Sequence, residues 1–335
     1  MEKKDFSTLP KEAANMNGKP RKMAEFLGDY YKGLGDGKAE LLGINTGFTK
    51  LNEATLGLDG VVVLGGIAGA GKTSFALQLA LAACQLTPTL FYSLEMPRQA
   101  ILTKILNRFG VKYRDILLKG KHYLTGQQSY EKSLSNKEAQ DLEMGKKFLE
   151  ERGGKFYIRS RDRGEERIDF ETVKREINFL KAEHKTERIF VVIDYLQVFD
   201  VGDYKDQIDK EGKLINGFRQ ISDETGAAIL LISQKNKQSF ASTDLQTIKG
   251  SVDIVYLADV VMFLDTDREK KRREARKQKP YSPQWQDDDI DSTIETYENK
   301  EETPIDLVIG KNRYNTPTVI KLQFNGRYST FSEMH

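Results

Sequence analysis

The segment that decides the fold reads Val61-Val62-Val63-Leu64-Gly65-Gly66-Ile67-Ala68-Gly69-Ala70-Gly71-Lys72-Thr73-Ser74. A short β-branched run leads into the pattern G-x-x-x-x-G-K-T, and the apolar stretch 75–83 that follows predicts a buried helix. Strand, glycine-rich loop and helix in this order are the context that a phosphate-binding P-loop requires. The alternative is a glycine-rich turn with an incidental lysine. All fixed positions and both flanks are present, which favours the P-loop.

Each part of this loop has a physical role in holding phosphates. The glycines let successive N–H groups turn towards a β-phosphate, and the helix N-terminus adds the positive end of its dipole. Lys72 is predicted to reach the β- and γ-phosphates, and the Thr73 hydroxyl to ligate Mg²⁺. The sequence therefore predicts a nucleoside triphosphate site formed by Gly66, Ala68, Gly69, Ala70, Gly71, Lys72, Thr73 and Ser74.

Composition sets the outer limits on the class of protein. The 335 residues are 39% hydrophobic and 30% charged, which allows a packed core in a soluble chain. The single cysteine, Cys84, excludes an internal disulfide. Residues 1–5 lack the apolar core of a signal peptide and no apolar run reaches membrane-spanning length, so a cytoplasmic protein is expected. A net charge of +2 does not by itself indicate nucleic-acid binding.

Residues 1–42 are predicted to form an N-terminal arm ahead of a domain over residues 43–335 that contains the P-loop. Residues 1–19 are polar and aperiodic, which is typical of a disordered segment. Apolar residues at helical spacing follow and predict a short amphipathic helix, with Met23, Phe26, Leu27, Tyr30 and Leu34 on one face. Two partners for this face remain open, namely the chain's own domain and a neighbouring subunit.

Downstream of the P-loop, strands and helices alternate. Strands are predicted at 89–93, 156–158, 189–194, 227–233, 259–264 and 305–309, and helices at 98–109, 135–152 and about 170–180. The chain closes with strands 319–324 and 327–331 around Asn325-Gly326, which is a hairpin signal. The predicted fold is α/β, with a mostly parallel central sheet flanked by helices and a C-terminal β-hairpin.

Polar residues stand at the carboxyl ends of three of these strands, where ligands of parallel sheets bind. Asp194 follows the apolar run 189–193, as does a Walker B acid that holds Mg²⁺ through its water shell; the alternative is a turn-capping aspartate. Glu95 ends the strand predicted to lie next to the P-loop strand. It is either a base for the attacking water or a solvated turn residue. Gln234 carries an amide suited to sensing the γ-phosphate.

Two five-residue segments, Ser93-Leu94-Glu95-Met96-Pro97 and Ile193-Asp194-Tyr195-Leu196-Gln197, resemble signatures of the RecA-like ATPase domain of DnaB-type replicative helicases. Further segments resemble the entry and later motifs of that family in the right order, and they are Thr46-Gly47-Phe48-Thr49-Lys50-Leu51-Asn52, Ser233-Gln234, Gly250-Ser251, Ala258-Asp259-Val260-Val261-Met262-Phe263 and Gly310-Lys311-Asn312-Arg313. The resemblance covers residues 43–335.

The resemblance implies a hexameric ring that hydrolyses ATP at its subunit interfaces and holds single-stranded DNA in its channel. It also implies replication partners such as primase, and a bacterial, phage or mobile-element origin. It makes Glu95 the catalytic base and Gln234 the sensor. By the same carry-over, Lys311 and Arg313 form the basic pair that reaches the γ-phosphate of the adjacent subunit, where a cation stabilises the transferred phosphoryl. The alternative for Arg313 is a surface arginine on a loop.

Three departures from the family pattern qualify this interpretation. The 42 residues before the core cannot hold the N-terminal domain that receives primase, so we expect a trimmed helicase or a ring with another use. In the DNA-facing segment, Gln246 and Thr247 replace an arginine and a glutamate. Nearby lysines are candidate DNA contacts or ordinary solvated residues, and they are Lys235, Lys237 and Lys249. The inserted stretch 266–303 is basic and then acidic, which predicts a mobile, solvated excursion.

The sequence thus favours an ATP-driven, DnaB-like motor on single-stranded DNA. Two other functions fit the same motifs. The first is a recombination or regulatory ATPase similar to RecA and RadA that remodels filaments without unwinding. The second is an ATP-binding loader or adaptor that assembles on a helicase and turns over little ATP.

Overall fold

The computed structural model describes residues 23–24, 41–112, 116, 134–160, 168–196, 199–234, 257–266 and 302–334. By its contacts the chain divides into residues 1–40 and 41–335, and the first unit is described only at Met23 and Ala24. The predicted amphipathic face, apart from Met23, lies outside the described residues. The candidate DNA lysines, Gln246, Thr247 and nearly all of the charged insertion do so as well.

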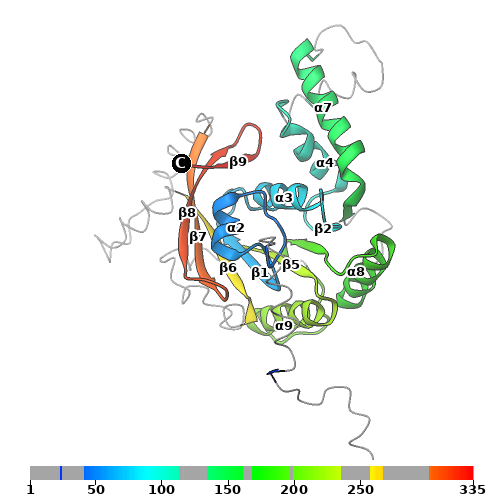
Figure 1. Cartoon of the computed structure of the whole chain (residues 1–335), viewed down its shortest axis with the longest axis vertical. Coiled ribbons are helices and arrows are strands. Elements are labelled where there is room, and N and C mark those ends of the chain that lie inside the picture. Colours follow the sequence, from blue (N-terminus) through cyan, green and yellow to red (C-terminus); the bar gives the residue numbers. More distant parts are fainter. Residues whose placement is uncertain are drawn as a thin grey trace, which may run out of the picture. The chain divides into compact units, whose positions relative to one another are not determined.

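The described strands form one nine-stranded sheet in the order β3-β2-β4-β5-β1-β6-β7-β8-β9 (Figure 1). The six neighbours from β3 to β6 are parallel, and the last three strands are antiparallel. This confirms the predicted α/β fold with a mostly parallel sheet. The strands are β1 (Val61–Gly66), β2 (Thr89–Ser93), β3 (Phe156–Ser160), β4 (Phe190–Asp194), β5 (Ala228–Gln234), β6 (Val260–Thr266), β7 (Glu302–Asn312), β8 (Thr318–Asn325) and β9 (Thr330–Glu333).

The helices flank this sheet, and most were predicted. They are α2 (Thr49–Thr55), α3 (Lys72–Ala83), α4 (Arg98–Asn107), α7 (Asn136–Arg152), α8 (Phe170–His184) and α9 (Gln207–Thr225). Helix α7 begins at a capping box, in which the Ser135 side chain and the Glu138 side chain each accept the other's backbone N–H. Helices α2 and α9 were not predicted. For α9 the signal existed, because Leu214, Phe218 and Ile221 recur at helical spacing and are buried.

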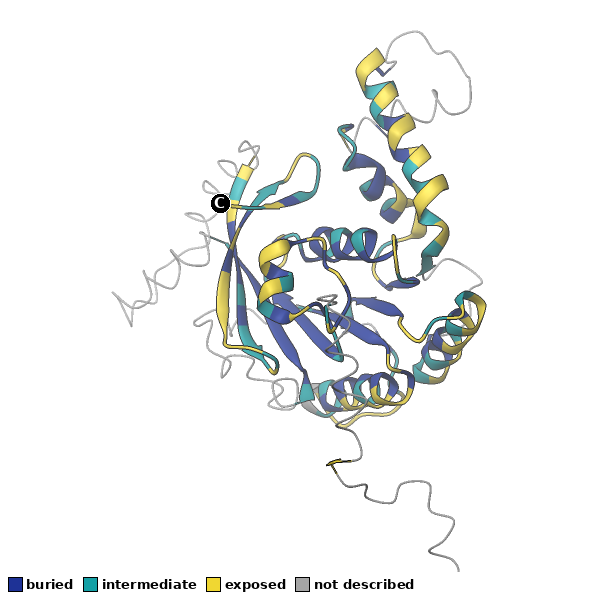
Figure 2. Ribbon diagram, viewed as in Figure 1, coloured by how far each residue is buried: buried dark blue, intermediate teal, exposed yellow. Residues whose placement is uncertain are grey.

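Two apolar cores cover the two faces of the sheet, since successive strand residues point to opposite sides (Figure 2). Val62 and Leu64 of β1 join the core that contains α3 and the C-terminal strands. Val61 and Val63 of the same strand join the core that contains α8 and α9. Strand β1 is therefore buried throughout, and the loop that follows it emerges from the rigid centre of the domain.

The predicted C-terminal hairpin is present, but its turn differs from the prediction. Strand β9 pairs with β8 with Asn325 opposite Thr330, so the loop holds residues 326–329 and not Asn325-Gly326 alone. The Asn325 side chain caps this longer loop by accepting a hydrogen bond from the Tyr328 N–H at 3.1 Å. The hairpin also binds α3, because the Gln78 side chain exchanges hydrogen bonds with both backbone groups of Phe331 at 2.8 and 2.9 Å.

Candidate nucleotide site

The loop between β1 and α3 has a backbone that favours glycine. Gly69 and Gly71 have φ of +80° and +86°, in the left-handed region that other residues rarely adopt. A Cβ on Gly71 would also come within 2.9 Å of the Phe331 ring, whereas one on Gly69 would meet nothing within 4 Å. Gly69 therefore lies on an open side of the loop, where the backbone can approach a ligand closely.

Lys72, the first residue of α3, lies across the loop. Its Nζ donates to the carbonyl oxygens of Gly66 at 2.9 Å and Ile67 at 2.8 Å, and the residue is buried. The loop thus holds an ammonium group at the N-terminus of a helix, where the helix dipole adds further positive potential. This combination suits the phosphates of a nucleotide.

Asp194, the last residue of β4, is the buried acid of the site. Its pKa is raised from 3.8 to about 6, chiefly by burial and also by the charge of Glu95, while the Thr73 hydroxyl bond and the charge of Lys72 oppose the rise. Within the described residues its Oδ2 is buried and has no hydrogen-bond partner. A buried carboxylate oxygen with an unmet bond beside the Thr73 hydroxyl fits a hard cation.

The donor set fits Mg²⁺ in particular. No group of three or more His, Cys, Asp or Glu residues that could hold a metal occurs in the described part of the chain. Mg²⁺ is usually held by one or two protein oxygens together with substrate phosphates and water. Thr73 and Asp194 would hold it here, where the ion, when bound, supplies positive charge to the β- and γ-phosphates.

Glu95 lies beside Asp194 and not beside the P-loop strand. The prediction that its strand is the neighbour of the P-loop strand is wrong, because β4 and β5 separate β2 from β1. Strand β2 instead pairs with β4 with Ser93 opposite Asp194, and the Leu94 N–H donates to the Asp194 carbonyl oxygen at 2.6 Å. Glu95 is exposed at this edge of the sheet, within electrostatic range of Asp194.

Gln234 occupies the corresponding position on β5, the strand between β4 and the P-loop strand β1. It is the last residue of β5 and pairs with Gly66, where the P-loop begins. The backbone register therefore brings this position to the loop.

Helix α4 adds two cations that sequence reasoning missed. The pKa of Lys104 is lowered by burial, and the charge of Asp194 opposes this, so the two groups are within electrostatic range. Burial lowers the pKa of Arg108 to about 10, and its guanidinium donates to the Ser329 carbonyl oxygen of the hairpin. Their four-residue spacing on a helix that follows the Glu95 turn was the available signal.

Lys311 and Arg313 lie at the opposite end of the sheet. Strand β7 runs antiparallel to β6, so Lys311 pairs with Val261 near the start of β6, while Gly66 pairs with Leu264 near its end. Arg313 follows β7 and forms an ion pair with Asp259, just before β6, at 2.6 Å. A strand of this length separates the two ends of the sheet by roughly 17 Å. The structure therefore does not bring this basic pair to the chain's own P-loop.

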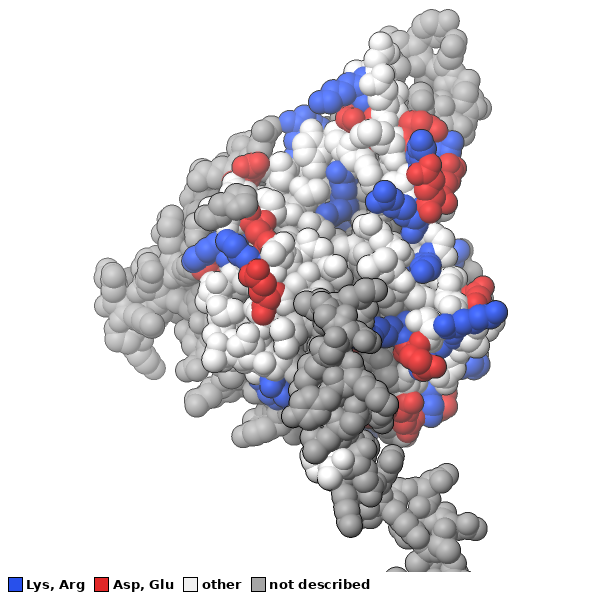
Figure 3. Space-filling view, viewed as in Figure 1, with Lys and Arg blue, Asp and Glu red and all other residues white. Residues whose placement is uncertain are grey.

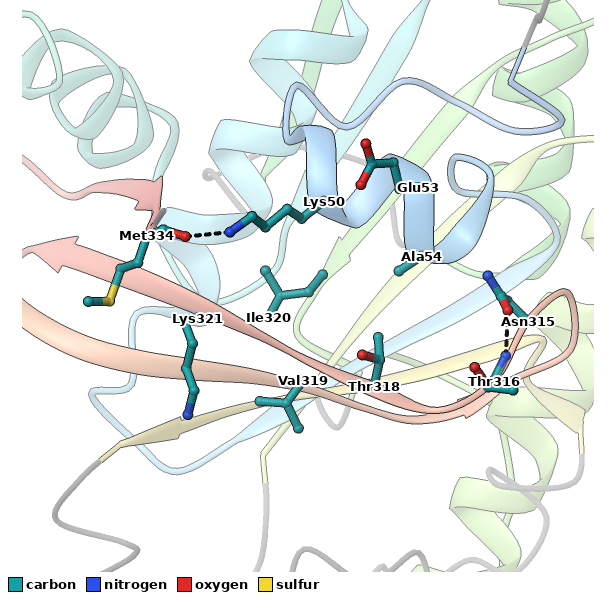
Figure 4. A pocket seen from close by; sticks show the side chains of 10 residues that line it. All are labelled: Lys50, Glu53, Ala54, Asn315, Thr316, Thr318, Val319, Ile320, Lys321 and Met334. Atoms are coloured by element: carbon teal, nitrogen blue, oxygen red, sulfur yellow. Dashed lines mark hydrogen bonds between the residues drawn. The ribbon is translucent and has the colours of Figure 1, made fainter.

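A pocket of about 510 Å³ lies between α2 and β8 (Figure 4). Lys50 and Met334 close one end of it through a hydrogen bond from the lysine Nζ to the methionine carbonyl oxygen. None of the predicted site residues lines it. It is therefore a separate surface feature.

The P-loop, the buried acid beside it and the parallel sheet define a RecA-like ATPase domain. Residues 43–333 match the family model described as DnaB-like helicase C terminal domain, and the chain belongs to this family. In the described residues we find no helix with the length and apolarity needed to traverse a bilayer.

Relatives and solved structures agree with this assignment. The chain is 23% identical over 316 residues to the replicative DNA helicase DnaB of Rickettsia bellii (strain RML369-C), and 23% over 309 residues to that of Haemophilus influenzae (strain ATCC 51907 / DSM 11121 / KW20 / Rd). These alignments cover 87% of the chain but only 57% and 55% of the relatives. The chain thus spans a little over half the length of these curated relatives.

The fold is similar to that of a separately solved ATPase domain, with a TM-score of 0.72 at 17% identity over 95% of this chain and all of that one. A DnaB-like replicative helicase, whose structure is described together with its interactions with primase, gives a TM-score of 0.72 at 18% identity, covering 94% of this chain and 69% of that one.

Proposed function

We propose that the chain hydrolyses ATP between subunits of a hexameric ring and couples this to translocation on single-stranded DNA. The observation that carries the proposal is the separation of Lys72 and Arg313 to opposite ends of the sheet. Among the described residues, Lys72 and Arg108 contact the P-loop segment and Lys104 lies near Asp194, whereas Lys311 and Arg313 lie at the other end of the sheet. A head-to-tail contact between copies would place one subunit's Arg313 at the next subunit's P-loop, and such contacts form a ring when the rotation between copies closes.

The chain's own residues divide the work within one nucleotide site. Lys72 neutralises the β- and γ-phosphates, and Thr73 with Asp194 holds Mg²⁺. Glu95, exposed next to Asp194, accepts the proton of the attacking water. Gln234 monitors the γ-phosphate. Arg313 from the neighbour stabilises charge on the transferred phosphoryl, a role that trans arginines elsewhere perform with an effect of ~10³-fold or more.

The test is complementation between two inactive variants. Arg313→Ala should bind ATP and lose hydrolysis by ~10³-fold, and Lys72→Ala should lose ATP binding or hydrolysis. In an equal mixture, about a quarter of randomly formed interfaces join an intact P-loop to an intact Arg313, and activity should exceed that of both parents. Rescue requires that one complete interface can hydrolyse ATP while the other interfaces of the ring are inactive.

The matched control is Arg188→Ala. Arg188 is exposed just before β4, so it lies at the amino ends of the parallel strands, as Arg313 does. It should retain wild-type hydrolysis. If Arg313→Ala hydrolyses ATP at the wild-type rate under assembling conditions, the trans arrangement is wrong and the helicase proposal weakens with it.

The DNA part of the proposal is tested separately through Lys235, Lys237 and Lys249. Their joint replacement by alanine should lower the slope of log affinity against log salt for oligo-dT by about 2, since each single-strand phosphate contact contributes about 0.7. The control removes Lys146 and Lys147 of α7, which already pair with Glu143 and Glu151 at 3.3 and 3.6 Å.

Acidic and basic side chains are interspersed over α7 and α8 on the face that Figure 3 shows. Loss of α7 charge should therefore leave the salt slope unchanged. Strand displacement on a forked substrate then distinguishes a helicase from an ATPase that only remodels filaments. DNA-stimulated hydrolysis distinguishes both from a loader with little turnover.

A further inference from the structure

Asp259 gathers several donors at the end of the sheet opposite the P-loop. It stands immediately before β6 and is buried, with 1% of its surface exposed. Its Oδ1 accepts from Arg313 Nη1 at 2.6 Å, and its Oδ2 accepts from Arg219 Nη1 at 2.6 Å and from the Val61 N–H at 2.9 Å. Both oxygens of one buried carboxylate are therefore engaged, and one of them holds Arg313.

The surrounding backbone is built for this carboxylate. Gly60 has a φ of +62°, and a Cβ placed on it would lie 2.0 Å from Asp259 Oδ2. Only glycine leaves room for the carboxylate to reach the start of β1. The backbone N–H of Arg313 also donates to the Asp259 carbonyl oxygen at 2.9 Å. Arg313 is thus held to Asp259 through both its main chain and its side chain.

Arg313 remains accessible while it is held. Its side chain is 46% exposed, and its contact with Asp259 goes through Nη1, one nitrogen of a group that carries five N–H donors. Arg219 is also paired with Asp223 at 3.0 Å, so it does not depend on Asp259 alone for a counter-charge. The arrangement fixes the direction of the Arg313 guanidinium and leaves donors for an external anion.

We propose that Asp259 is a positioning residue for Arg313 that pre-orients its guanidinium toward the nucleotide of the neighbouring subunit. The inference rests on the proposed action of Arg313 in trans. A long arginine side chain samples many rotamers when unpaired, and ordering it during the reaction costs rate. Misplacement of a catalytic group by about 1 Å can cost ~10²-fold, so an anchored guanidinium gains a comparable factor.

The test is Asp259→Asn in the full chain, measured as ATP binding, ATP hydrolysis and complementation. Binding should stay unchanged and hydrolysis should fall by roughly 10²-fold. Equal mixing with Lys72→Ala should restore activity, because that partner supplies an intact Arg313 and Asp259. Mixing with Arg313→Ala should not, since both partners then lack a working arginine. A variant with a folding defect alone would not be rescued by Lys72→Ala and left inactive by Arg313→Ala.

Two further variants keep the test decisive. Asp259→Asn/Arg219→Gln removes the carboxylate together with one of its cations, so it avoids leaving two guanidiniums around a neutral amide. The matched control is Asp306→Asn, a mostly buried aspartate of β7 that pairs with Lys321 at 2.8 Å. The control should change the stability of the protein, and it should not be rescued by one of the two mixing partners and left inactive by the other.

The outcomes separate this inference from the proposed function. Wild-type hydrolysis in folded Asp259→Asn, with Arg313→Ala inactive, would overturn the positioning role and leave the trans arginine intact. Rescue by Arg313→Ala instead of Lys72→Ala would place Asp259 on the P-loop side and overturn it as well. Circular dichroism showing that the single and double variants are both unfolded would assign Asp259 to folding only. Active Arg313→Ala would instead refute the proposed function itself.

Discussion

Replacing Asp194 by asparagine should make the ligand-free protein more stable while abolishing ATP hydrolysis. Burial raises the pKa of Asp194 from 3.8 to about 6, so the folded state disfavours the ionised carboxylate. Each pKa unit corresponds to 1.36 kcal/mol, and the rise therefore costs about 3 kcal/mol of folding free energy once the group is ionised. This figure already includes the attraction of Lys72 and Lys104, which lower the pKa.

The sign of the pH dependence follows from proton counting. Between about pH 4 and pH 6 the folded protein binds more protons at Asp194 than the unfolded chain, so stability falls as pH rises through this window. Above pH 6 the cost is constant. Asp194→Asn should therefore match the wild type near pH 4 and exceed it by up to about 3 kcal/mol at pH 7.5, or about 5 °C in Tm for a domain of this size.

The assay is thermal unfolding followed by circular dichroism at several pH values without nucleotide or Mg²⁺. Asp306→Asn is the matched control of opposite sign, because it removes a buried carboxylate that has a lysine partner and should lower Tm. The reasoning would be refuted if the Tm values of the wild type and of Asp194→Asn differed by the same amount at every pH from 4 to 7.5. Addition of Mg²⁺ and ATP should stabilise the wild type more than the variant, since a carboxylate holds the ion more strongly than a neutral amide does.

Three further predictions concern the same domain. Glu95→Gln should keep ATP binding and lose turnover, because an amide cannot accept the proton of water; loss of binding in a filter assay would make Glu95 structural. Lys104→Met should raise the pKa of Asp194 and move the acid limb of the ATPase pH profile upwards, whereas Lys147→Met on exposed α7 should not. Deletion of residues 1–40 should leave ATP binding intact. If the apolar face of the predicted N-terminal helix packs against a neighbouring subunit, the deletion should lower the mass of the assembly in light scattering. An unchanged mass with nucleotide present would indicate that this face packs against its own domain.

Strong local signals explain what the sequence predicted well. The P-loop is one continuous segment whose glycines, lysine and flanking elements are all readable, and the capping box before α7 is local as well. The apolar run 189–193 also indicated a buried strand with an acid at its end. In each case neighbouring residues determine the structure, so no knowledge of distant contacts was needed.

Long-range pairing explains what the sequence could not predict. The order of strands depends on crossovers that leave no local signal, so the sequence does not show that β4 and β5 lie between the strand of Glu95 and the P-loop strand. Asp259 and Arg313 are 54 positions apart, and only the antiparallel pairing of β7 with β6 makes them neighbours. The sequence predicts Asp259 only as the first residue of a strand and part of a segment that resembles a family motif, because nothing local shows that two arginines and the Val61 N–H converge on it.

The geometry of the sheet gives a reason why such a domain would need a partner to complete its chemistry. Parallel strands place the P-loop at their carboxyl ends, whereas the antiparallel β7 returns Arg313 to their amino ends. Because these ends lie on opposite sides of the sheet, the proposed function has Arg313 reach a γ-phosphate across a contact with another copy. On this reasoning the carboxylate of Asp259 faces one subunit boundary and that of Asp194 faces the other. Variants at the two positions should then complement each other in mixed rings, although each is inactive or impaired alone.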